Sequence, residues 1–226
     1  MQRSWRQDGD KLTFIACMPL SPNPSPCPAP QDSIGGEIAG ETAIQADEAP
    51  ITIRVGEYDS PALMLGDVNL FLSQADDDDD KKEADESGGS SCIGELELMI
   101  APPASRRHGY GRAAMLAFLH YINQHQDSIL SEYATSVHHA PSPHDPEKAP
   151  KQKMQLRCLR VKIAQQNAKS IALFESIGFA KRTAQPNYFG ELELRFDAFG
   201  GAEGPDASAG SWLPEGYREL RYERQC

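Results

Sequence analysis

Two glycines and their basic neighbours form the stretch of this chain that is best suited to hold an anion. The segment reads Arg106-Arg107-His108-Gly109-Tyr110-Gly111 and follows an apolar segment. Glycine lets the backbone approach a ligand closely, and the first N–H groups of a following helix then point at that ligand. Such a corner binds anions, phosphate above all, although a plain strand-to-helix turn is the alternative for a bare Gly-x-Gly.

The elements on either side of this corner follow from the spacing of apolar residues. Residues 95–100 predict a strand, and residues 101–105 predict a loop. The helix after the loop shows one apolar face, because its apolar residues recur at i, i+3, i+4 and i+7. They are Met115, Phe118, Leu119 and Ile122. The third glycine of a dinucleotide fingerprint and the Gly-Lys-Ser/Thr of a P-loop are both missing.

A second segment, residues 164–179, predicts another helix with clear ends. Asn167 is a good N-cap, and Gly178 suits the left-handed residue that ends a helix. Ile171 and Phe174 share one face of the helix between them.

The two segments together resemble the acyl-CoA site of the GNAT superfamily of N-acetyltransferases. The first matches Arg-x-x-Gly-x-Gly, and the second matches Asn-x-x-Ser-x-x-Leu-aromatic-x-x-x-Gly-Phe. The resemblance implies an α/β (α+β) GNAT fold, with a mixed, mostly antiparallel sheet flanked by helices, and acetyl-CoA as the acetyl donor. The residues that it implies in cofactor binding are Ile100, Ala101, Arg106, Arg107, His108, Gly109, Tyr110, Gly111, Asn167, Ser170 and Phe174.

Residues 4–15, 65–71 and 94–101 resemble the eukaryotic N-acetyltransferase 9 family, whose name links it to the N-termini of tubulins. The resemblance implies transfer to a protein amine, either an N-terminus or a lysine, with tubulin as a candidate acceptor. Family members begin with a further strand and two helices, so we expect an N-terminally incomplete domain. Those missing elements and Phe174 favour an alternative, a non-catalytic acyl-CoA-binding or microtubule-associated protein.

Transfer to an amine requires a group that removes a proton as the amine attacks the thioester. Glu95 and Glu97 are the candidates, since alternation along a strand places both on one face. A pair of solvated carboxylates is the alternative. The general acid is harder to assign: Phe174 stands where many GNAT enzymes have a tyrosine, Tyr188 lies on the last predicted strand, and a water could serve instead.

Composition restricts the remaining function classes. The net charge of −11 argues against a nucleic-acid partner, and no apolar run is long enough to span a membrane. Five scattered cysteines without metal-ligand spacing predict a reducing, cytoplasmic location and no structural zinc. Three histidines stand among prolines, but nothing there sets a zinc geometry. They are His138, His139 and His144.

Composition also predicts one domain interrupted by loops, which the resemblance implies is a GNAT domain over residues 1–196, followed by a flexible tail over residues 197–226. Three polar inserts are expected to be disordered: residues 19–50, 74–90 and 126–153. The second insert carries eight acidic and two basic residues. This run predicts a solvated loop rather than a metal-binding or partner-binding segment. Strands are predicted at residues 12–17, 51–55, 63–72, 156–163 and 188–196.

Overall fold

The computed structural model describes residues 8–19, 52–54, 56, 59–75, 90–137, 154–197, 217 and 219–223. The chain divides into two compact units, one of residues 1–16 with 66–217 and one of residues 17–65 with 218–226. The prediction of a single domain over residues 1–196 stays a prediction.

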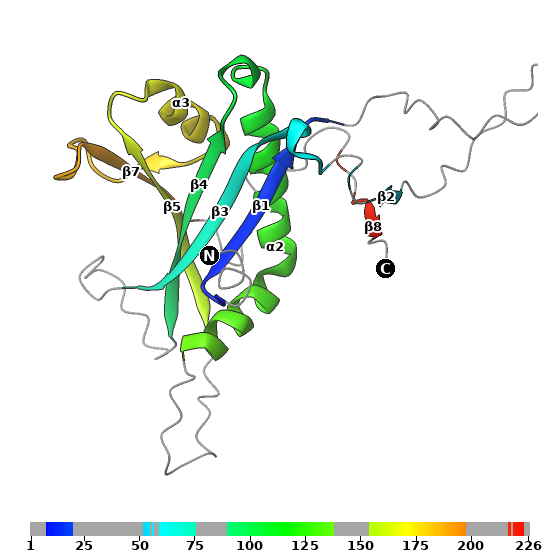
Figure 1. Ribbon diagram of the computed structural model, residues 1–226. Coiled ribbons are helices and arrows are strands. Elements are labelled where there is room, and N and C mark those ends of the chain that lie inside the picture. Colours follow the sequence, from blue (N-terminus) through cyan, green and yellow to red (C-terminus); the bar gives the residue numbers. More distant parts are fainter. Residues whose placement is uncertain are drawn as a thin grey trace, which may run out of the picture. The chain divides into compact units, whose positions relative to one another are not determined.

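A six-stranded mixed sheet forms the framework, with the strand order β1-β3-β4-β5-β7-β6 (Figure 1). Its strands are β1 (Lys11–Cys17), β3 (Met64–Gln74), β4 (Ser91–Ile100), β5 (Gln155–Ala164), β6 (Ala180–Lys181) and β7 (Glu191–Phe196). Among the pairings of this sheet whose register is described, β4/β5 is parallel, while β3/β4, β5/β7 and β6/β7 are antiparallel. The predicted mixed, mostly antiparallel sheet is therefore confirmed.

Within the described part of this unit, two α-helices accompany the sheet, α2 (Tyr110–Val137) and α3 (Ala168–Ile177). The predicted apolar face of α2 is confirmed, because each of its four residues is at most 3% exposed. The predicted ends of α3 are confirmed as well. The Asn167 side chain accepts a hydrogen bond from the Ser170 N–H at 3.2 Å, and Gly178 ends the helix with φ +114°.

One apolar cluster joins both helices to the sheet. It contains alternate residues of β3, such as Leu70, and of β5, such as Val161, together with Phe118 of α2 and Phe174 of α3. Since side chains alternate across a strand, the intervening polar residues lie on the other face. These include Asn69, Glu95, Glu97, Arg160 and Lys162.

The prediction of a disordered insert over residues 126–153 is wrong for its first part. Helix α2 continues to Val137, and Leu130 and Tyr133 are only 4% and 3% exposed. Their apolar spacing, shared with Ile129, extends the buried face by further turns. The polar residues between them concealed this pattern in the sequence. Residues 138–153 lie outside the described part.

Two other boundaries also differ from the prediction. The last strand begins at Glu191, because a turn occupies residues 188–190. Within the tail that was predicted to be flexible, β8 (Arg221–Glu223) pairs in parallel with β2 (Thr52–Arg54) in the second unit. Gln74 belongs to β3, whereas residues 20–50, 76–89 and 198–216 lie outside the described residues.

Gly66 gives a stability test of the β3/β4 pairing. A Cβ atom at this position would lie 1.7 Å from the Met99 carbonyl oxygen, so the two backbones would have to separate. We expect Gly66→Ala to lower the free energy of unfolding by about 1–3 kcal/mol in urea denaturation. The control is Gly111→Ala, whose Cβ would meet its nearest atom at 3.4 Å and should not destabilise the helix. Equal stability of both variants would contradict this packing.

Candidate functional site

The parallel strands β4 and β5 are paired along only half of their length. Their register runs from Ser91 opposite Gln155 to Glu95 opposite Arg160. Beyond this point β4 stays paired with β3 up to Ile100, and β5 stays paired with β7 up to Ala164. The two strands separate towards their C-terminal ends (Figure 1). We call this opening, between residues 96–100 and 161–164, the fork.

The glycine corner predicted from the sequence directly follows the fork. After a short 3-10 helix (Pro103–Ser105), Arg107 and Gly109 have left-handed φ values of +72° and +86°. The first helical hydrogen bond runs from the Ala113 N–H to the Gly109 carbonyl at 3.0 Å. The N–H groups of Tyr110 and Gly111 therefore have no acceptor within the helix. A Cβ at Gly109 would meet nothing within 4 Å, so the space beside it is open.

Arg106 connects the corner to the end of β4. Its Nε donates to the Ile100 carbonyl at 2.9 Å, and its Nη2 donates to the Ala101 carbonyl at 3.0 Å. The guanidinium thus folds back onto the strand, and it engages two carbonyls of residues that were predicted to hold the cofactor. His108 and Tyr110 stack their rings in the same loop, with centroids 5.9 Å apart.

Arg112 is a neighbouring residue that sequence reasoning missed. Its Nη1 donates to the Ser176 hydroxyl at 2.6 Å, which links the first turn of α2 to the last turn of α3. No spacing rule singles out this arginine, because its partner is 64 residues away.

The two candidate bases on β4 have different surroundings. Glu95 accepts at one oxygen, Oε2, from Arg160 Nε at 3.0 Å and from Lys162 Nζ at 2.9 Å. Glu97 is exposed and lies opposite Asn69 in the β3/β4 register. Its carboxylate has no hydrogen-bond or ion-pair partner in the described part of the chain.

The neighbour of Glu97 across the strands is fixed by hydrogen bonds. Asn69 is 8% exposed, accepts from the Thr13 hydroxyl at 2.7 Å, and donates to Asp67 at 2.9 Å. Sequence reasoning did not select these residues as a network, because the three bonding groups come from two strands. The network gives Glu97 a rigid flank on β3.

Helix α3 contributes the remaining predicted cofactor residues. The Asn167 amide caps the helix at Ser170, so its oxygen is engaged with the backbone. The Phe174 ring is 4% exposed and contacts Phe179 with centroids 5.2 Å apart. Tyr188, the tyrosine considered as the general acid, is 97% exposed in the turn before β7, and its ring contacts Phe189. The assignment of the acid therefore gains no support from either position.

The titratable groups whose pKa is shifted lie mostly in the interior. Burial, together with the smaller effect of the neighbouring Cys158, raises the pKa of Cys92 to about 12. Burial also raises the pKa of Cys158, against the lowering effect of Arg195. Both thiols are therefore protonated at neutral pH and are unsuited to nucleophilic chemistry.

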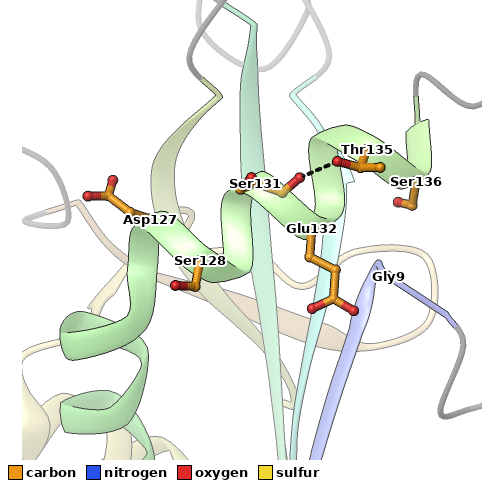
Figure 2. A pocket seen from close by; sticks show the side chains of 7 residues that line it. All are labelled: Gly9, Asp127, Ser128, Ser131, Glu132, Thr135 and Ser136. Atoms are coloured by element: carbon orange, nitrogen blue, oxygen red, sulfur yellow. Dashed lines mark hydrogen bonds between the residues drawn. The ribbon is translucent and has the colours of Figure 1, made fainter.

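A groove of about 770 Å³ lies at the C-terminal half of α2. Figure 2 shows the residues that line it. It is lined by Gly9, Asp127, Ser128, Ser131, Glu132, Thr135 and Ser136. Most of these residues belong to the C-terminal half of α2, roughly 25–40 Å along the helix from the glycine corner. None of the predicted site residues lines it.

Two other kinds of site find no support within the described ranges. No group of three or more His, Cys, Asp or Glu residues there could hold a metal ion. No helix in that part of the chain combines the length and apolarity that a membrane crossing needs.

Comparison with known proteins assigns the family. Residues 8–180 match the family Acetyltransf_3, described as an acetyltransferase (GNAT) domain. The chain is 31% identical over 207 residues to the N-acetyltransferase 9-like protein of Schizosaccharomyces pombe, covering 86% of this chain and 73% of that protein. The chain therefore belongs to the GNAT acetyltransferase family, which confirms the predicted N-acetyltransferase class.

Other relatives carry more specific names. The chain is 30% identical over 194 residues to the Alpha/beta-tubulin-N-acetyltransferase 9 of Drosophila melanogaster and 28% identical over 195 residues to that of Mus musculus. Each match covers 86% of this chain, but 62% and 51% of those proteins. The chain thus spans between half and three quarters of the lengths of these curated relatives.

The solved structures that match are more distant. Arabidopsis thaliana NAA60 in complex with acetyl-CoA is 11% identical, with a TM-score of 0.36, and 60% of this chain and 66% of that chain are covered. The ribosomal-protein-S18-alanine N-acetyltransferase from Escherichia coli is 15% identical, with a TM-score of 0.34 and coverages of 65% and 69%.

The glycine corner can be tested by thermal protection. Acetyl-CoA at 100 times its Kd should add about 2.7 kcal/mol to the free energy of unfolding. Gly109→Val should abolish this protection, because the side chain would fill the open space and the required φ of +86° is strained for valine. The measurement is Tm with and without acetyl-CoA.

Gly190→Val is the matched control. Gly190 also has a positive φ, +77°, and a Cβ placed there would meet nothing within 4 Å, but it lies outside the corner. This variant should lose stability yet keep its protection by acetyl-CoA. Equal protection of Gly109→Val and the parent would rule out the corner as the binding site.

Proposed function

We propose that this chain transfers the acetyl group of acetyl-CoA to a primary amine of a protein, with Glu97 as the general base. One observation carries the proposal: the fork opens directly before the glycine corner, and Glu97 lies on the part of β4 that no longer pairs with β5. The arrangement thus places three features next to one another: a corner that suits an anion, a strand edge that suits an extended chain, and a carboxylate.

The cofactor's two halves fit the two parts of this arrangement. The N–H groups of Tyr110 and Gly111 suit the pyrophosphate, because helix N-termini attract anions. The pantetheine arm is an extended chain with two amides, and the backbone edge of residues 96–100 offers it strand-like hydrogen bonds. Its thioester would then lie beside Glu97.

The reaction needs one proton to leave and one to arrive. The amine nitrogen attacks the thioester carbon while its proton passes to Glu97, directly or through a water. Backbone N–H groups at the fork stabilise the oxyanion, and collapse of the tetrahedral intermediate breaks the carbon–sulfur bond. The thiolate then takes a proton from water, since Phe174 cannot donate one.

The contacts favour Glu97 over Glu95. Two charged donors already occupy Oε2 of Glu95, and protonation there would require breaking these bonds. Glu97 makes no such contact in the described residues, and the Asn69 network supports the strand beside it.

An aromatic tip between β6 and β7 supports a protein acceptor. Tyr188 and Phe189 are 97% and 79% exposed. The Asn187 side chain fixes the turn, because its oxygen accepts from the Phe189 and Glu191 N–H groups at 2.9 Å. The Gln165 N–H donates to the Gly190 carbonyl, which joins the tip to the end of β5 where the fork opens. Rigid exposed aromatic side chains are typical of protein contact sites.

Tubulin is the acceptor that the names of the relatives suggest, and we adopt its N-termini as the first candidate. A cytoplasmic location agrees with this choice and with the free thiols of Cys17, Cys92 and Cys158.

Removing the Glu97 carboxylate tests the chemistry. Glu97→Gln should lower kcat roughly 10²–10⁴-fold while leaving acetyl-CoA affinity unchanged, because a general base acts in the transition state. The lost rate should recover as pH rises, since an α-amine with a pKa of about 8 then needs less help. The assay is transfer from acetyl-CoA to peptides that copy tubulin N-termini.

Glu175→Gln is the control, because it removes a carboxylate of α3 outside the site. Turnover of Glu97→Gln at the parental rate would show that Glu97 is not the base. A parent that binds acetyl-CoA but turns over no protein amine would favour the non-catalytic alternative.

The aromatic tip gives a separate test of the acceptor class. The double substitution Tyr188→Ala and Phe189→Ala should raise KM for a peptide acceptor about tenfold or more, because interface aromatics dominate such contacts. Acetyl-CoA affinity should stay constant, and both side chains are so exposed that stability should change little. An unchanged KM for the peptide would exclude the tip from acceptor binding.

A further inference from the structure

The point where β4 and β5 separate is marked by tight contacts on both faces of the sheet. On the apolar face, Gly94 lets Leu159 and Leu70 close over the strand. A Cβ at Gly94 would lie 2.7 Å from Leu159 Cδ2 and 2.8 Å from Leu70 Cδ1. The two leucine side chains therefore pack directly on the β4 backbone at Gly94, the residue before the last β4/β5 register pair.

On the polar face, the last rung carries an ion cluster of Glu95, Arg160 and Lys162. Glu95 and Arg160 are themselves the final register pair, joined at 3.0 Å. Lys162 lies two residues further along, on the part of β5 that no longer pairs with β4, and it reaches back to the same oxygen at 2.9 Å. One carboxylate thus holds both the last paired residue and the first separated stretch of β5.

The surroundings of the ion cluster strengthen its interactions. Side-chain exposures of 18%, 24% and 34% for Arg160, Glu95 and Lys162 limit screening by solvent. On the other edge of β5, the register places Lys162 opposite Glu193 and Arg160 opposite Arg195. Strand β5 is therefore fixed by β7 on one side, and Glu95 is the charged link to β4 on the other.

We propose that the ion cluster of Glu95, Arg160 and Lys162 sets the opening of the fork, so that Glu95 is a positioning residue for the pantetheine arm rather than the base. The proposal rests on the proposed function. An inserted chain must lie about 4.8 Å from each strand to bond with both. If the ion cluster already holds the two strands at this spacing, binding of the cofactor does not have to supply the free energy of ordering them.

The two halves of the cofactor provide the test. Isothermal titration should compare acetyl-CoA with adenosine 3′-phosphate 5′-diphosphate, which has the pyrophosphate but lacks the pantetheine arm. Glu95→Gln should raise the Kd for acetyl-CoA about tenfold and change the Kd for the nucleotide by no more than about twofold. The reason is that only the pantetheine arm enters the fork. If Glu95 acted only through its negative charge, removing that charge would instead strengthen the binding of both anionic ligands.

Lys162→Met is the second variant, since it keeps the aliphatic stem and removes only the separated partner of Glu95. It should weaken acetyl-CoA in the same selective way. The control is Glu175→Gln, which breaks an ion pair with Lys181 at 2.9 Å elsewhere on the surface and should bind both ligands like the parent.

The outcomes separate this proposal from the proposed function. Parental acetyl-CoA affinity in Glu95→Gln, or an equal loss of both ligands, would overturn the positioning role. A parent chain that binds neither ligand would overturn the cofactor site itself.

Discussion

The partial pairing of β4 and β5 is the constraint on which the rest of the site depends. Two parallel strands that are neighbours in a sheet need a crossover connection, and α2 provides it here. The first turn of that helix must then follow the C-terminal end of β4. Because β4 and β5 also separate at this end, the proposed anion-binding corner and the edge of β4 that no longer pairs with β5 lie beside each other as a result of chain topology.

The polar face of the sheet divides its charges unevenly around this constraint. Towards β5 and β7, carboxylates and cations alternate, as in the contacts of Arg195 with Glu193 and of Arg160 with Glu95. Towards β3, Asn69 bonds to Asp67, and Glu97 has no cation beside it among the described residues. The sheet thus separates a region where ion pairs fix the geometry from a region where the proposed base has no ion-pair partner among the described residues.

Local sequence signals predicted much of this structure. The apolar spacing of Met115, Phe118 and Ile122 predicted the buried face of α2, and the types of Asn167 and Gly178 predicted both ends of α3. These features depend on residues within one or two turns. They could be read without knowing the fold.

The missed features depend on partners that are distant in the chain. Alternation placed Glu95 and Glu97 on one face, but only the β4/β5 register shows that Arg160 and Lys162 engage one of them. The last turns of α2 were missed because polar residues interrupt the apolar spacing there, although packing against the sheet stabilises the helix. The sequence also gives no sign that Arg106 bonds to the carbonyls of Ile100 and Ala101. An arginine beside a predicted phosphate site is instead expected to bind the anion.

The position of Arg106 has a consequence for how binding energy is distributed. Its guanidinium donates hydrogen bonds to the carbonyls of Ile100 and Ala101 at the end of β4. An amide of an incoming ligand that seeks either carbonyl must displace or share an existing charge-assisted bond, so the net gain is small. If acetyl-CoA binds as proposed, contacts at the end of β4 would contribute mainly to alignment. The main share of the affinity would come from the N–H groups of the first turn of α2, which have no acceptor within the helix.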